Sequence, residues 1–158
     1  MRPLARLSTA RCTRGFTLVE LAVTLAIVGL LAGAVALTLP DDASIFRKEA
    51  DAFAAHLALA RDESILGTRD VQVIADAGGY DVERRGFEDW RPLRTGPFRA
   101  VAWREGTQPL FANDRVRTTF RFDPTGSALP AELHLANGTA RLRVRVDLAG
   151  KVSIDALD

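Results

Sequence analysis

The residue with the clearest chemical demand in this 158-residue sequence is an acid at the start of a long apolar run. Glu20 is followed by 19 uncharged residues, 21–39. A carboxylate costs about 2.5–3.5 kcal/mol at the centre of a bilayer and less near its surface. We therefore expect Glu20 either to have a cationic partner or to lie at the level of the lipid headgroups.

The other reactive side chains give no catalytic or metal-binding pattern. His56 and His134 have no histidine or cysteine near them in the sequence, and Cys12 is the only cysteine. Nucleophilic catalysis needs a nucleophile beside a base, and a structural zinc site needs four ligands. No phosphate loop or paired-histidine motif is present. We expect no enzyme, no metal and no cofactor, and interpret both histidines as surface or packing residues.

Three arginines alternate with apolar residues near the C-terminus. Arg141, Arg143 and Arg145 would share one face of a strand and could bind a phosphate backbone. The whole chain has 21 basic and 20 acidic residues, which excludes a strongly basic nucleic-acid binder. We expect this stripe to be solvated and locally paired, and nucleic acid not to be a partner.

The first 40 residues divide into a basic leader and a membrane span. Residues 1–15 hold four arginines and no acid. The 19 uncharged residues would span about 28 Å as a helix, close to the ~30 Å hydrocarbon core of a bilayer. The arginines predict that residues 1–15 stay in the cytoplasm and that residues 40–158 lie in the periplasm of a bacterium. A cleaved secretory signal is disfavoured because the run is too long and no Ala-x-Ala site follows.

The remaining residues predict an α+β domain. Apolar residues recur at spacings of three and four from Phe46 to Ala60, which indicates an amphipathic helix ending near residue 66. Pro40 is tolerated in a first helical turn, so we expect one long, bent helix from about 17 to 66, with residues 16–39 in the membrane. The period then changes to two, and we expect antiparallel strands near 71–74, 80–82 and 116–122 with an irregular 86–114.

The last third predicts a three-stranded antiparallel meander. A two-residue turn at Asn137-Gly138 would set Leu133 opposite Leu142 and Glu132 opposite Arg143. Its strands would cover 131–136, 139–147 and 151–156.

The second turn of this meander needs a different length. A two-residue loop would mix the two faces of the strands, whereas a three-residue loop with a left-handed Gly150 keeps them apart. This loop would place Asp155 beside Arg143, and it would form the pairs Val146–Val152 and Val144–Ile154.

The junction between leader and apolar run is specific. Residues 14–21 read Arg-Gly-Phe-Thr-Leu-Val-Glu-Leu. This resembles the processing signal of type IV pilins and type II secretion pseudopilins. The resemblance implies that a prepilin peptidase cleaves between Gly15 and Phe16, that the Phe16 amine is methylated, and that Glu20 pairs with an adjacent subunit's N-terminus during assembly. Cleavage would leave 17 basic and 20 acidic side chains and no cysteine.

Four later blocks resemble the GspH/FimT group of these subunits: residues 59–65, 90–93, 122–126 and 146–152. The group's fold is a long N-terminal helix packed on an antiparallel two-sheet β domain, which agrees with the periodicity. The resemblance implies a minor pseudopilin of a type II secretion system, between the tip pseudopilins and the shaft of the periplasmic pseudopilus. The implied partners are other pseudopilins, the prepilin peptidase and the inner-membrane assembly platform.

Two alternatives remain open. One is a FimT/FimU-like minor pilin of a type IV pilus, including one that takes up DNA. The other is a membrane-tethered periplasmic enzyme or ligand-binding module, which would need a cleft with converging polar groups and would leave the Gly15–Phe16 junction unexplained.

Overall fold

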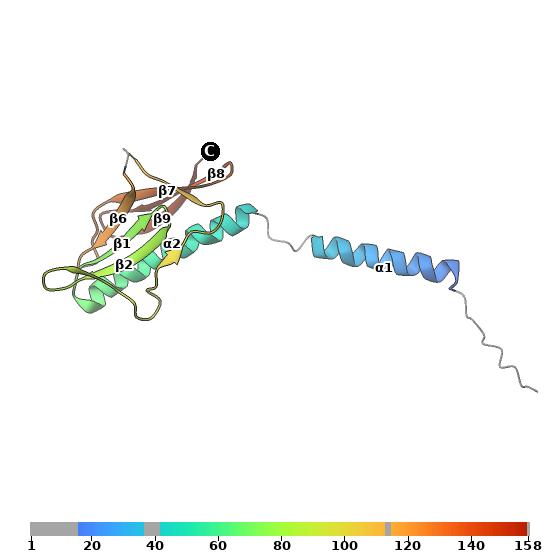
Figure 1. Ribbon diagram of the computed structural model, residues 1–158, viewed down its shortest axis with the longest axis horizontal. Helices are drawn as coiled ribbons and strands as arrows, with labels where there is room; N and C mark the ends of the chain where they lie inside the picture. The colour runs from blue at the N-terminus through green and yellow to red at the C-terminus, as the bar shows by residue number, and fades with distance from the viewer. Residues whose placement is uncertain (1–15, 37–41, 113–114, 158) are drawn as a thin grey trace, which may run out of the picture. The chain divides into compact units, whose positions relative to one another are not determined.

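The computed structural model describes residues 16–36, 42–112 and 115–157. The chain separates into two compact units, Met1–Pro40 and Asp41–Asp158. The first contains the helix α1 (Leu18–Ala36), and the second contains α2 (Asp42–Gly67) and all the strands (Figure 1). The predicted continuity of one helix from 17 to 66 depends on residues 37–41, which lie outside the described residues.

The described residues of the first unit contain one helix, α1, of 19 residues. Apart from Glu20 and Thr24 its residues are apolar or glycine, and the side chains described, from residue 18 to 34, are all exposed. Within the described part of the chain, no helix combines the length and the apolar character that crossing a membrane requires.

The second unit contains two antiparallel sheets, and every strand pairing in them is antiparallel. The first has the order β3-β2-β1-β6, with β4 also paired to β2. Its strands are β1 (Val71–Asp76), β2 (Gly79–Arg85), β3 (Trp90–Pro92), β4 (Val101–Ala102) and β6 (Arg117–Phe122). The second sheet has the order β5-β7-β8-β9. Its strands are β5 (Gln108–Leu110), β7 (Ala131–Asn137), β8 (Ala140–Val146) and β9 (Val152–Leu157).

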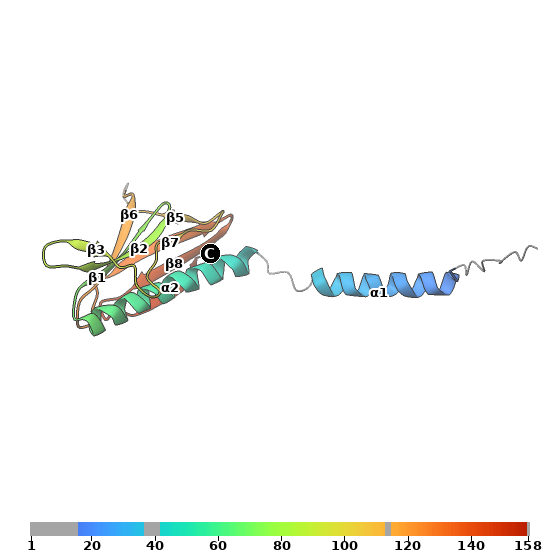
Figure 2. The ribbon, with the colours of Figure 1, turned by 60° about the horizontal axis from the view of Figure 1, so that its bottom comes forward.

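The core lies between α2 and the two sheets, with the helix running along them (Figure 2). The buried stripe of α2 has the spacing that the sequence predicts and consists of Phe46, Ala50, Phe53, Leu57, Ala60 and Ser64. Phe53 is at its centre, with its ring centroid 4.8 Å from that of Tyr80, 5.3 Å from Trp103 and 5.8 Å from Phe120. The predicted α+β architecture, a helix packed on a two-sheet β domain, is confirmed.

The predicted register of the first hairpin of the meander is wrong by two residues. Asn137 pairs with Ala140, so the turn consists of Gly138 and Thr139, and Leu133 lies opposite Val144. Gly138 has a φ of +55°, and a turn that puts glycine in its first central position needs this conformation. Because strand side chains alternate, a shift of two residues leaves every side chain on its predicted face.

The same shift changes the neighbours of the charged residues. Glu132 lies opposite Arg145, and Arg143 lies opposite His134. The second hairpin has the predicted register: Arg143 pairs with Asp155, and the pairs Val144–Ile154 and Val146–Val152 are present. The φ of Gly150 is +73°, the left-handed conformation expected for it.

Candidate functional site

The predicted processing and assembly residues are at the start of α1. Phe16 precedes the helix with its side chain 78% exposed, whereas Gly15 lies outside the described residues. Thr17 caps the helix: its Oγ1 accepts a hydrogen bond of 3.2 Å from the backbone N–H of Glu20, and its carbonyl accepts one of 3.1 Å from Leu21. This is one half of a Thr-x-x-Glu capping box. This cap is not among the features predicted from the sequence, although the spacing of Thr17 and Glu20 signals it.

Glu20 is therefore an acid in the first turn of a capped helix, with an exposed side chain. A negative charge there is stabilised by the positive end of the helix dipole. Among the described residues, no cation lies within ion-pair distance of its carboxylate. The fold thus tolerates this acid at the helix start and leaves the carboxylate accessible.

Three of the sequence blocks from the later part of the chain meet at one point of the second unit. Arg61, in the last turns of α2, donates from Nε to the carbonyl of Gly126 at 2.9 Å. Ser64 donates from Oγ to the Asp123 carbonyl, also at 2.9 Å. A Cβ at Gly150 would lie 2.1 Å from the Gly126 carbonyl oxygen. The blocks 59–65, 122–126 and 146–152 therefore form one packing contact between α2 and two turns.

The Asp123 turn uses its own carboxylate. Oδ1 accepts hydrogen bonds from the Thr125 hydroxyl at 2.6 Å, from the Thr125 N–H at 2.8 Å and from the Ser127 N–H at 3.1 Å. The Thr125 hydroxyl contributes most to lowering the pKa of Asp123, and the backbone N–H groups add to it. The Asp123 carboxylate thus closes this turn through hydrogen bonds to the residues that follow it.

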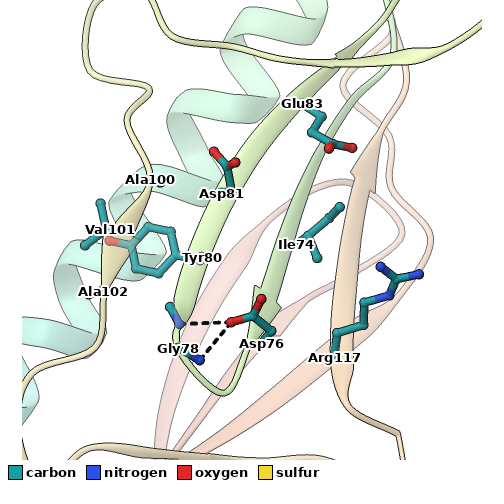
Figure 3. A pocket seen from close by; sticks show the side chains of 11 residues that line it. Ile74, Asp76, Gly78, Tyr80, Asp81, Glu83, Ala100, Val101, Ala102 and Arg117 are labelled. Carbon is teal, nitrogen blue, oxygen red and sulfur yellow. Dashed lines mark hydrogen bonds between the residues drawn. The ribbon is translucent and has the colours of Figure 1, made fainter.

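An open groove of about 540 Å³ lies beside the hairpin of β1 and β2 (Figure 3). It is lined by the carboxylates of Asp76, Asp81 and Glu83, with Arg117 at one side. Asp76 Oδ1 accepts from the N–H groups of residues 78 and 79 at 2.8 and 3.1 Å, and Glu83 accepts from the Gln72 amide at 2.7 Å. These acids already have structural hydrogen-bond partners.

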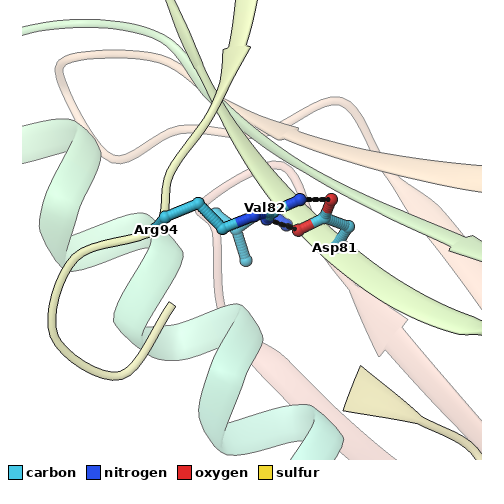
Figure 4. Close-up of polar contacts among 3 residues, drawn as sticks. All are labelled: Asp81, Val82 and Arg94. Atoms are coloured by element: carbon cyan, nitrogen blue, oxygen red, sulfur yellow. Dashed lines mark hydrogen bonds and ion pairs between the residues drawn. The ribbon is translucent and has the colours of Figure 1, made fainter. Parts of the chain in front are cut away.

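Asp81 is the most strongly engaged acid of this groove. It forms a two-point ion pair with Arg94, with Oδ2 at 2.7 Å from Nη2, and Oδ1 also accepts from the Val82 N–H at 2.8 Å (Figure 4). The hydrogen bond from Arg94 contributes most to holding the pKa of Asp81 below its usual range. Asp81 is therefore ionised at neutral pH and unsuited to donate a proton.

The two histidines lie in different surroundings. His56 Nδ1 is 3.0 Å from the Ala52 carbonyl and 3.4 Å from the Tyr80 hydroxyl, and its ring packs on that of Tyr80. His134 lies on β7, with Nε2 3.5 Å from a Glu132 oxygen. In the parts of the chain that the structure describes, no three His, Cys, Asp or Glu side chains are grouped to hold a metal ion.

Two arginines of the predicted stripe on β8 are paired locally, as expected. Arg143 Nη2 contacts Asp155 at 3.1 Å. Arg141 donates to the carbonyls of Gly138 and Ala140 at 2.8 and 3.0 Å. Arg145 is exposed, opposite Glu132. This face therefore combines cations with acids.

A capped apolar helix, followed by a unit in which a helix packs on two antiparallel sheets, defines a pilin-like structural subunit. The particular family follows from the sequence of the second unit. The model of the family "Type II transport protein GspH" matches residues 49–150, and the chain belongs to this family. A model of the prokaryotic N-terminal methylation motif matches residues 10–36.

Solved structures share the fold. The minor pseudopilin EpsH from the type 2 secretion system of Vibrio cholerae is 19% identical, with a TM-score of 0.60 over 70% of this chain and 95% of that one. The type IV minor pilin FimU of Pseudomonas aeruginosa is 13% identical, with a TM-score of 0.54 over 71% of this chain and 97% of that one. No curated protein matches the chain significantly.

These matches confirm the predicted resemblance and the assignment to the minor pseudopilins of type II secretion, a family of structural subunits. The FimU-like alternative shares the fold and is less favoured, because the family model that matches is the one for the type II transport protein. Membership of this family implies assembly with other pseudopilins.

Proposed function

We propose that the protein links the tip pseudopilins to the shaft of a type II secretion pseudopilus in the periplasm. A single observation carries this proposal: an N-terminal methylation motif over residues 10–36 precedes a GspH match over residues 49–150 in one chain. The motif supplies a means of entering a fibre, and the GspH part supplies the domain that neighbouring subunits bind. Its action is mechanical, because the fibre grows by adding subunits.

In this proposal the prepilin peptidase removes residues 1–15 by cleaving between Gly15 and Phe16, and the new Phe16 amine is methylated. The match to the methylation motif supports this step. So does the position of the N-cap, since Thr17 starts the helix one residue after the new terminus. Cleavage would thus remove the basic leader and leave α1 complete.

We place residues 16–39 across the inner membrane as a single span, with the N-terminus in the cytoplasm and residues 40–158 in the periplasm. Residues 21–39 contain no charged side chain, and four arginines precede the span. The inner-membrane assembly platform would then take subunits from the bilayer.

Glu20 is the proposed assembly residue. Its carboxylate is exposed and has no cationic partner among the described residues. The Phe16 amine of a neighbouring subunit would supply the cation that a carboxylate in an apolar setting requires. The ion pair would form only when two subunits meet. It would therefore favour one register of neighbouring helices in the fibre.

The decisive experiment is deletion of the gene, scored for both exoprotein secretion and twitching motility. Loss of secretion alone supports the pseudopilin. Loss of motility alone supports the FimU-like pilin, whose specific support here is the shared fold.

Processing is tested separately by Gly15→Leu, which should leave the leader attached because the bulky side chain blocks cleavage. A normally shortened Gly15→Leu protein would contradict the proposed cleavage site.

A further inference from the structure

Four arginines line one small pocket of the second unit. The pocket has a volume of about 170 Å³ and lies where the turn after α2 meets the loop between β2 and β3. Its cationic lining consists of Arg69, Arg84, Arg85 and Arg91, and no carboxylate is among its lining residues.

The charges of this pocket are only half balanced. Arg84 contacts Glu63 at 3.2 Å and Arg91 contacts Asp89 at 3.1 Å. Neither of the other two, Arg69 and Arg85, has a carboxylate within ion-pair distance among the described residues. Two guanidinium groups therefore have no counter-ion in the described parts of the chain.

Each of these two guanidinium groups lies over an aromatic ring. Arg69 lies over the ring of Phe87, 5.5 Å from its centroid, and Arg85 lies over Trp90 at the same distance. Stacking of this kind pre-orients the planar donors for an anion that binds at two points. Two guanidinium groups that face one pocket without a carboxylate partner supply the donors that an anion would need.

Phe87 adds an apolar side chain to the lining of the pocket. Its side chain is 94% exposed, although burying a phenylalanine is worth about 1.5–3 kcal/mol. A second hollow of about 260 Å³ on this surface is also lined by Phe87, Arg69 and Arg85. The second hollow also contains Asp70, whereas the lining of the pocket has no acid. An exposed aromatic ring beside two arginines is typical of a protein-binding surface, where aromatic residues and arginines provide most of the affinity.

We propose that this pocket binds a carboxylate side chain of a neighbouring pseudopilin, with Phe87 packing against an apolar residue beside that acid. The proposal rests on the proposed function and adds to it the surface and the chemistry of one contact between subunits. A pocket of this size accepts a single acidic group, and the stacked guanidinium forks match the two oxygens of a carboxylate.

The charge of the whole unit favours a protein acid over a polyanion. Residues 41–158 contain 17 basic and 19 acidic side chains, so the pocket is a local cationic spot on a mildly acidic surface. A nucleic acid or an anionic membrane needs an extended basic surface, and would be repelled by the surrounding acids. One carboxylate on a complementary protein surface meets the cationic spot without this repulsion.

The test compares the full chain in detergent with a variant carrying Arg69→Gln and Arg85→Gln. Each of these two proteins is titrated with every one of the other pseudopilins of the same secretion system, which are purified separately. Parallel titrations use duplex DNA and vesicles containing anionic phospholipid. Arg99→Gln with Arg145→Gln is the matched control, since both arginines are exposed and neither lines the pocket. Circular dichroism and thermal melts verify folding, and Phe87→Ser provides a second variant that retains both arginines and removes the ring beside Arg69.

We expect the arginine variant to weaken binding to one pseudopilin by about ten- to a hundredfold, because it removes charge-assisted hydrogen bonds. Phe87→Ser should weaken the same binding, and the control should leave it unchanged. Unchanged affinity for every pseudopilin that the unaltered chain binds would overturn the pocket assignment while leaving the proposed function intact. If the arginine variant loses affinity only for DNA or only for vesicles, the partner of the pocket is a nucleic acid or a membrane and the proposal of a protein carboxylate is wrong. Failure of the unaltered chain to bind any pseudopilin would overturn both proposals.

Discussion

Arg61 Nε donates a hydrogen bond of 2.9 Å to the carbonyl oxygen of Gly126, across 65 residues of sequence. The contact joins α2 to the turn between β6 and β7. The neighbouring turn at Gly150 packs on the same point, where an added Cβ would meet the Arg61 Nε at 2.7 Å. Arg61 and the Gly150 turn thus meet at the Gly126 carbonyl, so the sequence blocks that contain these residues form one packing contact.

Removing this guanidinium group should destabilise the second unit. Arg61→Ala loses the hydrogen bond to Gly126 and leaves a part-buried carbonyl without its charged donor. We expect the free energy of unfolding to fall by about 1.5–3 kcal/mol, the usual value for a hydrogen bond to a charged group. Urea unfolding followed by circular dichroism measures it. Asp62→Ala, at an exposed neighbouring position, is the control and should change stability by less than about 0.5 kcal/mol.

Two turn glycines offer a matched comparison of close packing. Gly138 and Gly150 both have positive φ, at +55° and +73°. A Cβ at Gly138 would meet nothing within 4 Å, whereas a Cβ at Gly150 would lie 2.1 Å from the Gly126 carbonyl oxygen. Gly138→Ala should therefore cost about 1–2 kcal/mol for its backbone alone. Gly150→Ala should cost at least about 1–3 kcal/mol more, and equal unfolding free energies for the two variants would contradict the packing argument.

The architecture could be predicted because it depends on periodicity. The buried stripe of α2, from Phe46 to Ser64, follows directly from apolar spacing, and so do the two faces of β8 and β9. The register of the first hairpin could not be fixed in this way. Asn137-Gly138 fits a turn at 137–138 and a turn at 138–139, whose strand registers differ by two residues. Both put Leu133 on the buried face, so the apolar pattern cannot choose between them.

The helix cap and the arginine pocket also differ in whether the sequence alone could predict them. Thr17 and Glu20 are local, so their spacing alone signals the cap that the structure contains. The arginine pocket is formed by three separate segments, the turn after α2, the end of β2 and β3. Arg84, Arg85 and Arg91 are close in sequence, but it is the β2–β3 hairpin that sets Arg91 opposite Arg84. Arg69 precedes them on the turn after α2 and reaches the same pocket through the fold. Only the fold places these cations together.

Tyr80 should titrate far above a free tyrosine. Burial, and secondarily the charge of Glu49, raise its pKa from 10.0 to about 12. It is the only tyrosine in the chain, so absorbance at 295 nm should report its ionisation alone. Because the folded pKa is the higher one, its contribution to stability is complete below pH 10 and is lost as the pH rises towards 12. Glu49→Gln should lower this pKa slightly, and titration near 10 in the folded protein would contradict the burial argument.

Two substitutions in the first turn of α1 should separate the carboxylate of Glu20 from the cap. Glu20→Gln keeps the backbone N–H that bonds to Thr17 and removes the charge, while Thr17→Ala does the reverse. The cap is worth about 1 kcal/mol of helix stability. If Glu20 pairs with a neighbouring N-terminus, Glu20→Gln should insert into the membrane normally and be strongly depleted from sheared pseudopili. Thr17→Ala should be incorporated nearly as well as the unaltered chain, because it keeps the acid. Immunoblots of membrane and fibre fractions measure both. Equal depletion of the two variants would indicate that α1 needs only an ordered first turn for assembly. Normal incorporation of Glu20→Gln would contradict the proposed pairing of Glu20 with a neighbouring N-terminus.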